Sequence, residues 1–110
     1  MKGVMILSTV SSLEDAERIA KHLVEKKLAA CVNIVPGVTS FYFWKGELQK
    51  DSELILFIKT TKEAEEQAIN EIRKVHPYEV PEILSLSIEN GLEEYINWMK
   101  GSVIHESRGK

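Results

Sequence analysis

Residues 38–61 read VTSFYFWKGELQKDSELILFIKTT, and they form two strand-like runs on either side of Lys45-Gly46. The first run ends in four consecutive aromatic residues at 41–44, and the second extends from Glu47 to Thr61. A glycine in a two-residue connection favours a tight hairpin. We therefore expect two long paired strands, with a kink in the second strand at the polar residues 49–52.

The length of this hairpin has a consequence for assembly. Strands this long would extend beyond a domain of ordinary size, and the aromatic residues 41–44 would then face water. A second subunit that covers them would remove this exposed apolar surface. The hairpin alone therefore predicts an oligomer.

The residues before the hairpin predict a strand, a helix and another strand. Residues 4–9 form a short apolar run typical of a buried strand, and Ser11–Asp15 supply a helix start with a capping box. The run at 29–35 is suited to a strand, and Pro36-Gly37 indicates a bend or bulge in it. The helix between these strands carries one apolar stripe, formed by Ala16, Ile19, Ala20, Leu23, Val24 and Leu28.

The residues after the hairpin predict a helix, a strand and a final helix. The first helix begins at Thr61 or Lys62 and ends near Val75, because Pro77 disfavours a helical conformation at His76. Its buried side is formed by Ala64, Ala68, Ile69 and Ile72. A strand follows at 82–88, and the turn Asn90-Gly91 leads into a helix that carries Leu92, Tyr95, Ile96 and Met99. The tail at 107–110 is expected to fray.

This order of elements predicts one α+β domain over residues 1–110. Strand, helix, strand, strand, helix, strand is the ferredoxin-like βαββαβ arrangement, an antiparallel sheet with helices on one face, here with an additional C-terminal helix. No repeat or linker divides the 110 residues.

Composition narrows the possible partners and compartments. The 14 basic residues are interleaved with 17 acidic ones, giving a net charge of -3, which argues against a nucleic-acid partner. No apolar run has the length of a membrane span, and the start has no signal-peptide pattern, so we expect a cytoplasmic protein without membrane contact. The only cysteine, Cys31, excludes an internal disulfide and a cysteine-rich zinc site.

Four motifs resemble the CutA family of divalent-cation tolerance proteins. They are LAACVN at 28–33, FWKGE at 43–47 followed by IKTT at 58–61, HPYEVPE at 76–82 and EYINW at 94–98. The resemblance implies a PII-like homotrimer in which the long hairpins cross subunit boundaries. It also implies a role in tolerance to copper and other divalent cations, and it implies no reaction.

His76 is the leading metal candidate, with Glu79 and Glu82 as possible co-ligands. Neutral imidazole binds copper or zinc, and His76 lies just beyond a helix end in a loop stiffened by two prolines. The alternative is that His76 only orders this loop and complements the helix C-terminus. His22 is interpreted as a surface residue and His105 as a tail residue. The copper pattern of some family members, a cysteine and two adjacent histidines, corresponds here to Ser8, Val75 and His76, so only one of the three ligands is present.

A second candidate site is an intersubunit ligand cleft. In the family, the matching positions that line this cleft are Cys31, Trp44, Lys59, Glu82 and Trp98. Lys59 lies in an apolar strand, where its ammonium needs a carboxylate or a wet cleft, and Glu82 is the expected partner. The alternatives are that these residues only specify the subunit interface and that Cys31 packs as a small hydrophobe.

Two functions follow as hypotheses. The first is a non-catalytic trimer that binds divalent cations, with copper implied by the resemblance. The second is a PII-like sensor that holds a small anionic ligand in the intersubunit cleft. A nucleophile elbow, a phosphate-binding glycine loop and an HExxH motif are all missing from the sequence, so no enzyme is predicted.

Overall fold

The computed structural model describes residues 2–104, and their element order is the predicted one. The elements are β1 (Gly3–Val10), α1 (Leu13–Glu25), β2 (Cys31–Trp44), β3 (Glu47–Thr61), α2 (Glu65–Val75), β4 (Ile83–Ile88) and α3 (Glu93–Ser102). The strands form one antiparallel sheet in the order β2-β3-β1-β4. This order confirms the ferredoxin-like α+β prediction. The expected fraying at 107–110 lies outside the described residues.

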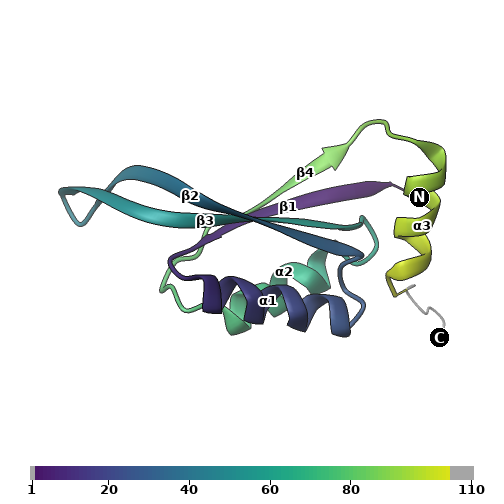
Figure 1. Ribbon diagram of the computed structural model, residues 1–110, viewed down its shortest axis with the longest axis horizontal. Helices are drawn as coiled ribbons and strands as arrows, with labels where there is room; N and C mark the ends of the chain where they lie inside the picture. Colours follow the sequence, from purple (N-terminus) through teal and green to yellow (C-terminus); the bar gives the residue numbers. More distant parts are fainter. Residues whose placement is uncertain (1, 105–110) are drawn as a thin grey trace.

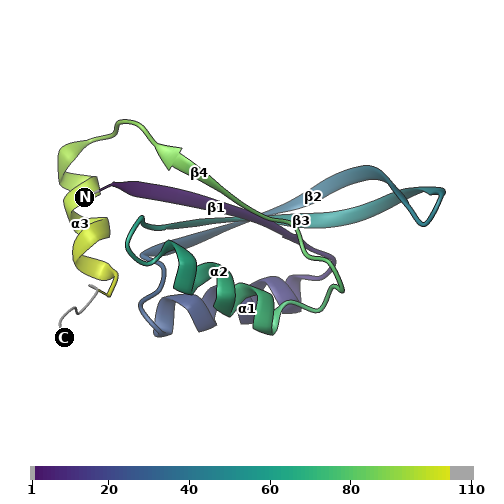
Figure 2. The same cartoon turned by 180° about the vertical axis from the view of Figure 1, so that it is seen from behind.

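One face of the sheet packs against α1 and α2, which lie side by side in both views (Figures 1 and 2). Alternate residues of β1 point to this face, so Val4, Ile6 and Val10 are buried. The core cluster consists of Val4, Ile6, Val10, Ala16, Ile19, Leu23, Leu28, Ala29, Leu56, Ile58, Ala68 and Ile72. The predicted stripe of α1 is confirmed at most positions, but Val24 is 41% exposed and does not belong to it.

Local chemistry sets the helix ends. Ser12 is the N-cap of α1, and its Oγ accepts a hydrogen bond from the Asp15 backbone N–H at 3.1 Å. The prediction that α2 begins at Thr61 or Lys62 was wrong, because Thr61 is still paired with Gly3 in the sheet and α2 starts at Glu65. The end of α2 at Val75 is confirmed, since His76 before the proline has an extended ψ of 136°.

The β2–β3 hairpin is paired from Cys31 opposite Lys59 to Trp44 opposite Glu47. At its tip Lys45 and Gly46 have φ angles of 53° and 83°, as a tight hairpin turn requires. The predicted bulge at Pro36-Gly37 is confirmed by a register shift between Val35 and Val38. The predicted kink at 49–52 is wrong, because these residues stay in unbroken register with residues 39–42.

The C-terminal helix α3 closes one end of the sheet, beside the start of β1 (Figure 1). Met99 on α3 is fully buried, and a Cβ atom at Gly3 would lie only 2.7 Å from the Met99 Cε atom. The Ile104 N–H donates to the Lys27 carbonyl at 2.8 Å, which fixes the end of α3 to the end of α1. A side chain at position 3 would therefore require the flexible end of Met99 to shift.

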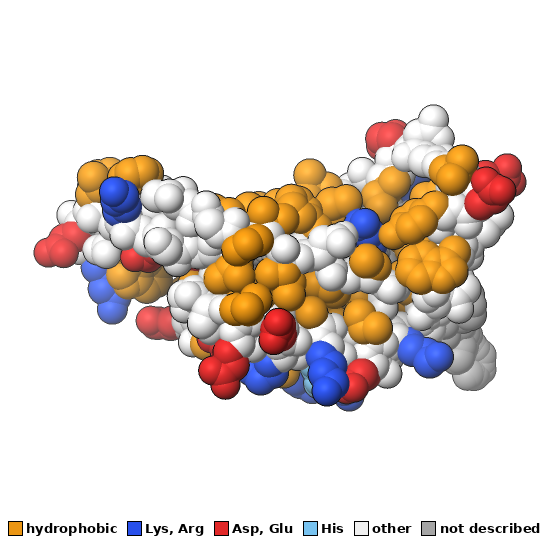
Figure 3. Space-filling model, in the orientation of Figure 1, with side chains coloured by type: hydrophobic (Ala, Val, Ile, Leu, Met, Phe, Trp, Pro, Cys, Tyr) orange, Lys and Arg blue, Asp and Glu red, His pale blue; other side chains and the backbone are white. Residues whose placement is uncertain are grey.

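Two apolar surfaces are left uncovered by residues 2–104 of a single chain. The far half of the β2–β3 hairpin extends beyond α1 and α2, and the sheet face opposite these helices has no covering layer (Figures 1 and 2). Phe43 is 73% and Leu48 63% exposed on the hairpin, and Leu84 is 56% exposed on β4. Hydrophobic side chains gather at the hairpin end and across the middle of the face drawn in Figure 3. In residues 2–104 no helix is long and apolar enough to cross a membrane.

Candidate functional site

An open groove of about 870 Å³ lies between the hairpin and the loop after α2. It is lined by Thr9, Ser11, Ser40, Phe41, Tyr42, Trp44, Asp51, Ser52, Glu53, Tyr78, Glu79, Val80 and Glu82. Four of these described residues are acidic, and none of them is a lysine or arginine. Because like charges near one another are unfavourable, such a lining favours a bound cation.

Glu53 and Tyr78 join the two sides of the groove. The Tyr78 hydroxyl donates to the Glu53 Oε2 atom at 2.7 Å, although 25 positions separate the two residues in the sequence. Burial and this bond to Glu53 raise the pKa of the Tyr78 hydroxyl well above its usual value. The side chain of Glu53 is only 8% exposed, so the bond anchors the loop to a buried point on β3.

Tyr42 and Asp51 form a second tyrosine–carboxylate pair, nearer the hairpin tip. The Tyr42 hydroxyl donates to the Asp51 Oδ2 atom, and this bond raises the pKa of the Tyr42 hydroxyl. The acid lies on β3 and the tyrosine on β2, so the pair links the two strands of the hairpin. The groove thus combines carboxylates with neutral phenols.

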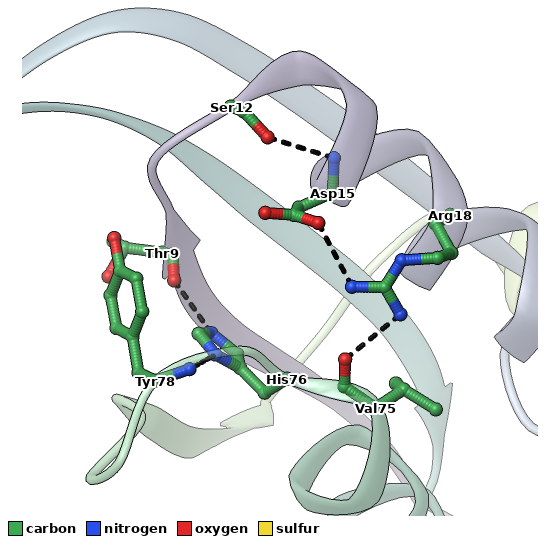
Figure 4. A network of polar contacts seen from close by, with 7 residues as sticks. All are labelled: Thr9, Ser12, Asp15, Arg18, Val75, His76 and Tyr78. Atoms are coloured by element: carbon green, nitrogen blue, oxygen red, sulfur yellow. Dashed lines mark hydrogen bonds and ion pairs between the residues drawn. The ribbon is translucent and has the colours of Figure 1, made fainter.

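His76 is buried, and both of its ring nitrogens are hydrogen-bonded. Its Nε2 atom lies 2.8 Å from the Thr9 carbonyl oxygen, and its Nδ1 atom accepts from the Tyr78 backbone N–H at 3.1 Å (Figure 4). A carbonyl can only accept, so the ring proton is on Nε2. Burial lowers the pKa of His76, with the bond to Thr9 acting in the opposite direction. The imidazole is therefore neutral at pH 7.

Arg18 connects this region to α1. Its Nη1 atom donates to the Val75 carbonyl and its Nη2 atom to the Asp15 Oδ1 atom, both at 3.0 Å (Figure 4). The bond to Arg18 lowers the pKa of Asp15. The last residue of α2 is thereby fixed to the first turns of α1, immediately before the chain enters the groove loop.

The predicted metal ligands do not come together in one chain. Glu79 and Glu82 line the groove, but His76 is absent from the lining, and its nitrogens are already bonded. Within residues 2–104 no group of three or more His, Cys, Asp or Glu side chains is arranged to hold a metal ion. The set His76, Glu79 and Glu82 therefore does not fit a copper site built from a single chain.

The predicted cleft residues fall into two groups at opposite ends of the sheet. Cys31 and Lys59 are ladder partners near α3, where the Lys59 Nζ atom lies 3.5 Å from the Tyr95 hydroxyl oxygen. The Tyr95 and Trp98 rings are 5.3 Å apart, so Trp98 belongs to this end. Trp44 and Glu82 instead line the groove.

The expected contact between Lys59 and Glu82 does not form within one chain. Lys59 pairs with Met5 on β1, whereas Ile83, the neighbour of Glu82, pairs with Ser8. Lys59 and Glu82 are therefore separated by three ladder positions, at roughly 3.3 Å each, and by the width of β1. Such a contact would need a second chain.

Sequence reasoning missed Glu53 and Tyr95. Glu53 immediately precedes the apolar run 54–58, and an acid at such a position could have indicated a buried carboxylate. Nothing in the sequence pointed to Tyr95 as the neighbour of Lys59. His22, expected at the surface, is partly buried and contacts Glu71 of α2 at 2.7 Å, while His105 lies outside the described residues.

The fold and groove define a ferredoxin-like α+β domain with an overhanging hairpin and an acidic cleft. Residues 4–102 match the sequence model of a family described as CutA1 divalent ion tolerance protein. The chain therefore belongs to the CutA1 divalent ion tolerance protein family.

Individual relatives agree with this membership. A divalent-cation tolerance protein CutA from Thermus thermophilus is 51% identical over 96 residues, which are 87% of this chain and 93% of the relative. A chloroplastic CutA from Arabidopsis thaliana is 41% identical over 91% of this chain, which spans only 55% of that relative. The solved structure of a divalent cation tolerance protein from Thermus thermophilus has a TM-score of 0.89 at 48% identity, covering 92% of this chain and 98% of that one.

Proposed function

We propose that this chain acts in divalent-cation tolerance by binding cations weakly at the carboxylates of the groove, Glu79 and Glu82 among them. The observation that supports this most is the lining itself, which contains four acidic residues and, within residues 2–104, no lysine or arginine. Two or more carboxylates with bound water form a weak, exchangeable site for a divalent ion.

The chemistry of the groove bears on which ion binds. Copper is the ion that the family resemblance implies, but copper favours nitrogen and sulfur ligands. The side chains that line the groove offer carboxylate and hydroxyl oxygens, which suit harder ions such as Mn²⁺ or Mg²⁺. The affinity of any one site for these ions still rises from Mn²⁺ to Cu²⁺, so we infer that the groove binds both ions and binds Cu²⁺ more tightly.

Titration calorimetry tests this proposal. Wild-type protein and the double variant Glu79→Gln/Glu82→Gln are titrated with MnCl₂ and with CuCl₂, and Glu93→Gln on the exposed start of α3 is the matched control. We expect the heat of Mn²⁺ binding to be lost in the double variant and to stay at the wild-type value in the control. Equal heats of binding in all three proteins would show that Glu79 and Glu82 do not bind the cation.

We also propose that the protein is a homotrimer. The uncovered sheet face and the exposed hairpin support a partner copy, because apolar surface of this extent is unusual on a monomer. In a head-to-tail arrangement, Lys59 from one chain could approach the acidic groove, with Glu82, of the next. Three such contacts close a ring.

A small-anion sensor is the second candidate, and Lys59 is the observation that favours it. Its ammonium lies 5.5 Å from the centre of the Tyr95 ring, on the uncovered face of the sheet. A cation beside aromatic walls suits a small anionic ligand. A thermal-shift screen tests this, since a ligand at a hundred times its Kd stabilises by roughly 2.7 kcal/mol. A ligand-induced thermal shift that persists in Lys59→Met would exclude Lys59 as part of the binding site.

We propose finally that the protein is non-catalytic and cytoplasmic. The sequence supports the first point because it carries no recognisable catalytic motif. A related CutA is named chloroplastic, so the compartment needs its own test. Cell fractionation with an antibody against the native chain provides it, and recovery outside the cytoplasmic fraction would refute the assignment.

A further inference from the structure

The imidazole of His76 has no nitrogen free for a metal. A metal ligand needs a nitrogen lone pair, and in a neutral ring only one nitrogen has one. In His76 that atom is Nδ1, and it already accepts the Tyr78 N–H at 3.1 Å. The other nitrogen donates its proton to the Thr9 carbonyl at 2.8 Å. The side chain is also only 7% exposed, so an ion would have to displace protein to reach it.

The same bonds place His76 at the start of a chain of contacts into the groove. Thr9 is on β1, so the Nε2 bond fixes the ring to the sheet. The Tyr78 ring packs edge-on against the His76 ring with their centres 4.7 Å apart, and its hydroxyl reaches Glu53 on β3. A continuous path therefore runs from β1 through His76 and Tyr78 to β3 (Figure 4 shows its first part).

We propose that His76 is a positioning residue and not a metal ligand: as a neutral hydrogen-bonded bridge it holds loop 76–82, and with it Glu79 and Glu82, at the groove. The loop is held at its beginning from three elements, by Arg18 of α1 at the Val75 carbonyl, by β1 and by β3. Glu79 and Glu82 make no contribution to this anchoring, and both side chains remain exposed. The cation-binding half of this inference rests on the proposed function, whereas the hydrogen-bonded bridge does not.

NMR of the intact His76 imidazole tests the proposed hydrogen-bonded bridge directly. The chain has three histidines, so the variant His22→Gln/His105→Gln leaves His76 as the only imidazole. At pH 7 we expect a protonated Nε2 signal and an unprotonated Nδ1 signal, as the bonding pattern requires. A proton on Nδ1, or rapid averaging of the two nitrogens, would overturn the proposal.

A zinc titration then distinguishes a positioning role of His76 from a role as metal ligand. Titration with ZnCl₂, a diamagnetic probe, is expected to move the backbone amide signals of Glu79 and Glu82 and to leave both His76 nitrogens in place. A metal-dependent shift of either ring nitrogen would overturn the positioning role while cation binding stood. If neither the amides nor the ring respond, the cation-binding half of the inference fails together with the proposed function, and the tautomer result alone decides the bridge.

Hydrogen exchange provides a second measurement of the bridge. Loss of the Nδ1 acceptor in His76→Gln should speed exchange of the backbone amide at position 78 roughly 3- to 10-fold, as expected for one hydrogen bond. The control Glu82→Gln changes an exposed side chain of the same loop that takes no part in the anchoring, and it should leave that amide protected. Equal exchange in wild type and His76→Gln would contradict the proposal. Should His76→Gln fail to fold, the tautomer measurement on the intact imidazole remains decisive.

Discussion

The helix-covered half of the sheet and the β2–β3 hairpin contain equally apolar residues in opposite surroundings. Ile6 and Ile19 in the covered half are 0% exposed, whereas Phe41 and Phe43 on the hairpin are 64% and 73% exposed. The described part of the chain therefore covers one sheet face only. The difference supports the proposed assembly, in which other copies of the chain cover the apolar surface of the hairpin.

The largest effect is expected from breaking the hairpin surface. Phe43 and Leu48 face each other across the ladder, and Phe43→Ser/Leu48→Ser removes both apolar side chains. A buried aromatic anchor contributes about 2 kcal/mol to an interface, so three copies should weaken a trimer by roughly 6 kcal/mol. Sedimentation velocity should show the variant as single chains with unchanged far-UV circular dichroism. Glu47→Ser, a polar change at the same tip, should leave the assembly intact.

A core deletion should act on folding instead of assembly. Leu23 is 0% exposed, and Leu23→Ala should lower the free energy of unfolding by about 2–5 kcal/mol. Its neighbour Val24 is 41% exposed, so Val24→Ala should change it by only about 0.5 kcal/mol. Urea unfolding followed by circular dichroism measures both. Similar losses at the two positions would show that the face of α1 is assigned incorrectly.

Ser8 offers a way to improve the covered half. Its Oγ atom is fully buried and, among residues 2–104, has no hydrogen-bond partner. An unsatisfied buried hydroxyl is unfavourable, so Ser8→Ala should raise the free energy of unfolding by about 1 kcal/mol. The measurement is again urea unfolding, at matched protein concentration. A clear destabilisation would mean that the hydroxyl has a partner in solution.

The smallest effect concerns pH. Hydrogen bonds from Lys62 and then Ser85 hold the pKa of Glu65 below its ordinary value of 4.5. A carboxyl with a lowered folded-state pKa stabilises above 4.5, and this stabilisation is lost as the pH falls through the folded-state value. Thermal melting from about pH 6 down to about pH 3 should therefore show a shallower acid loss for Glu65→Gln than for wild type. Parallel curves of melting temperature against pH for the two proteins would exclude a contribution of Glu65 to the acid loss of stability.

Much of the fold follows from local signals. The proline at position 77 ends α2, Ser12 caps α1 and Lys45-Gly46 turns the hairpin, each through chemistry confined to neighbouring residues. The start of α2 was not predictable in this way. Thr61 looks like a helix start in the sequence, but its pairing with Gly3, far along the chain, keeps it in the sheet.

The site was less predictable because its bonds are long-range. The sequence singled out His76, but its partner Thr9 is 67 positions away, and no local pattern reveals that both nitrogens are used. The expected Lys59–Glu82 contact failed within one chain because strand register places the two residues apart. Motif spacing identified the residues, and tertiary structure assigned their contacts.

Sedimentation equilibrium of the wild-type protein at micromolar concentration is the decisive test of whether other copies cover the hairpin and the bare sheet face. If the apolar surfaces are shared in a trimer, we expect a single species with the mass of three chains. A stable species with the mass of one chain would contradict it, because the exposed aromatic surface would then need no partner.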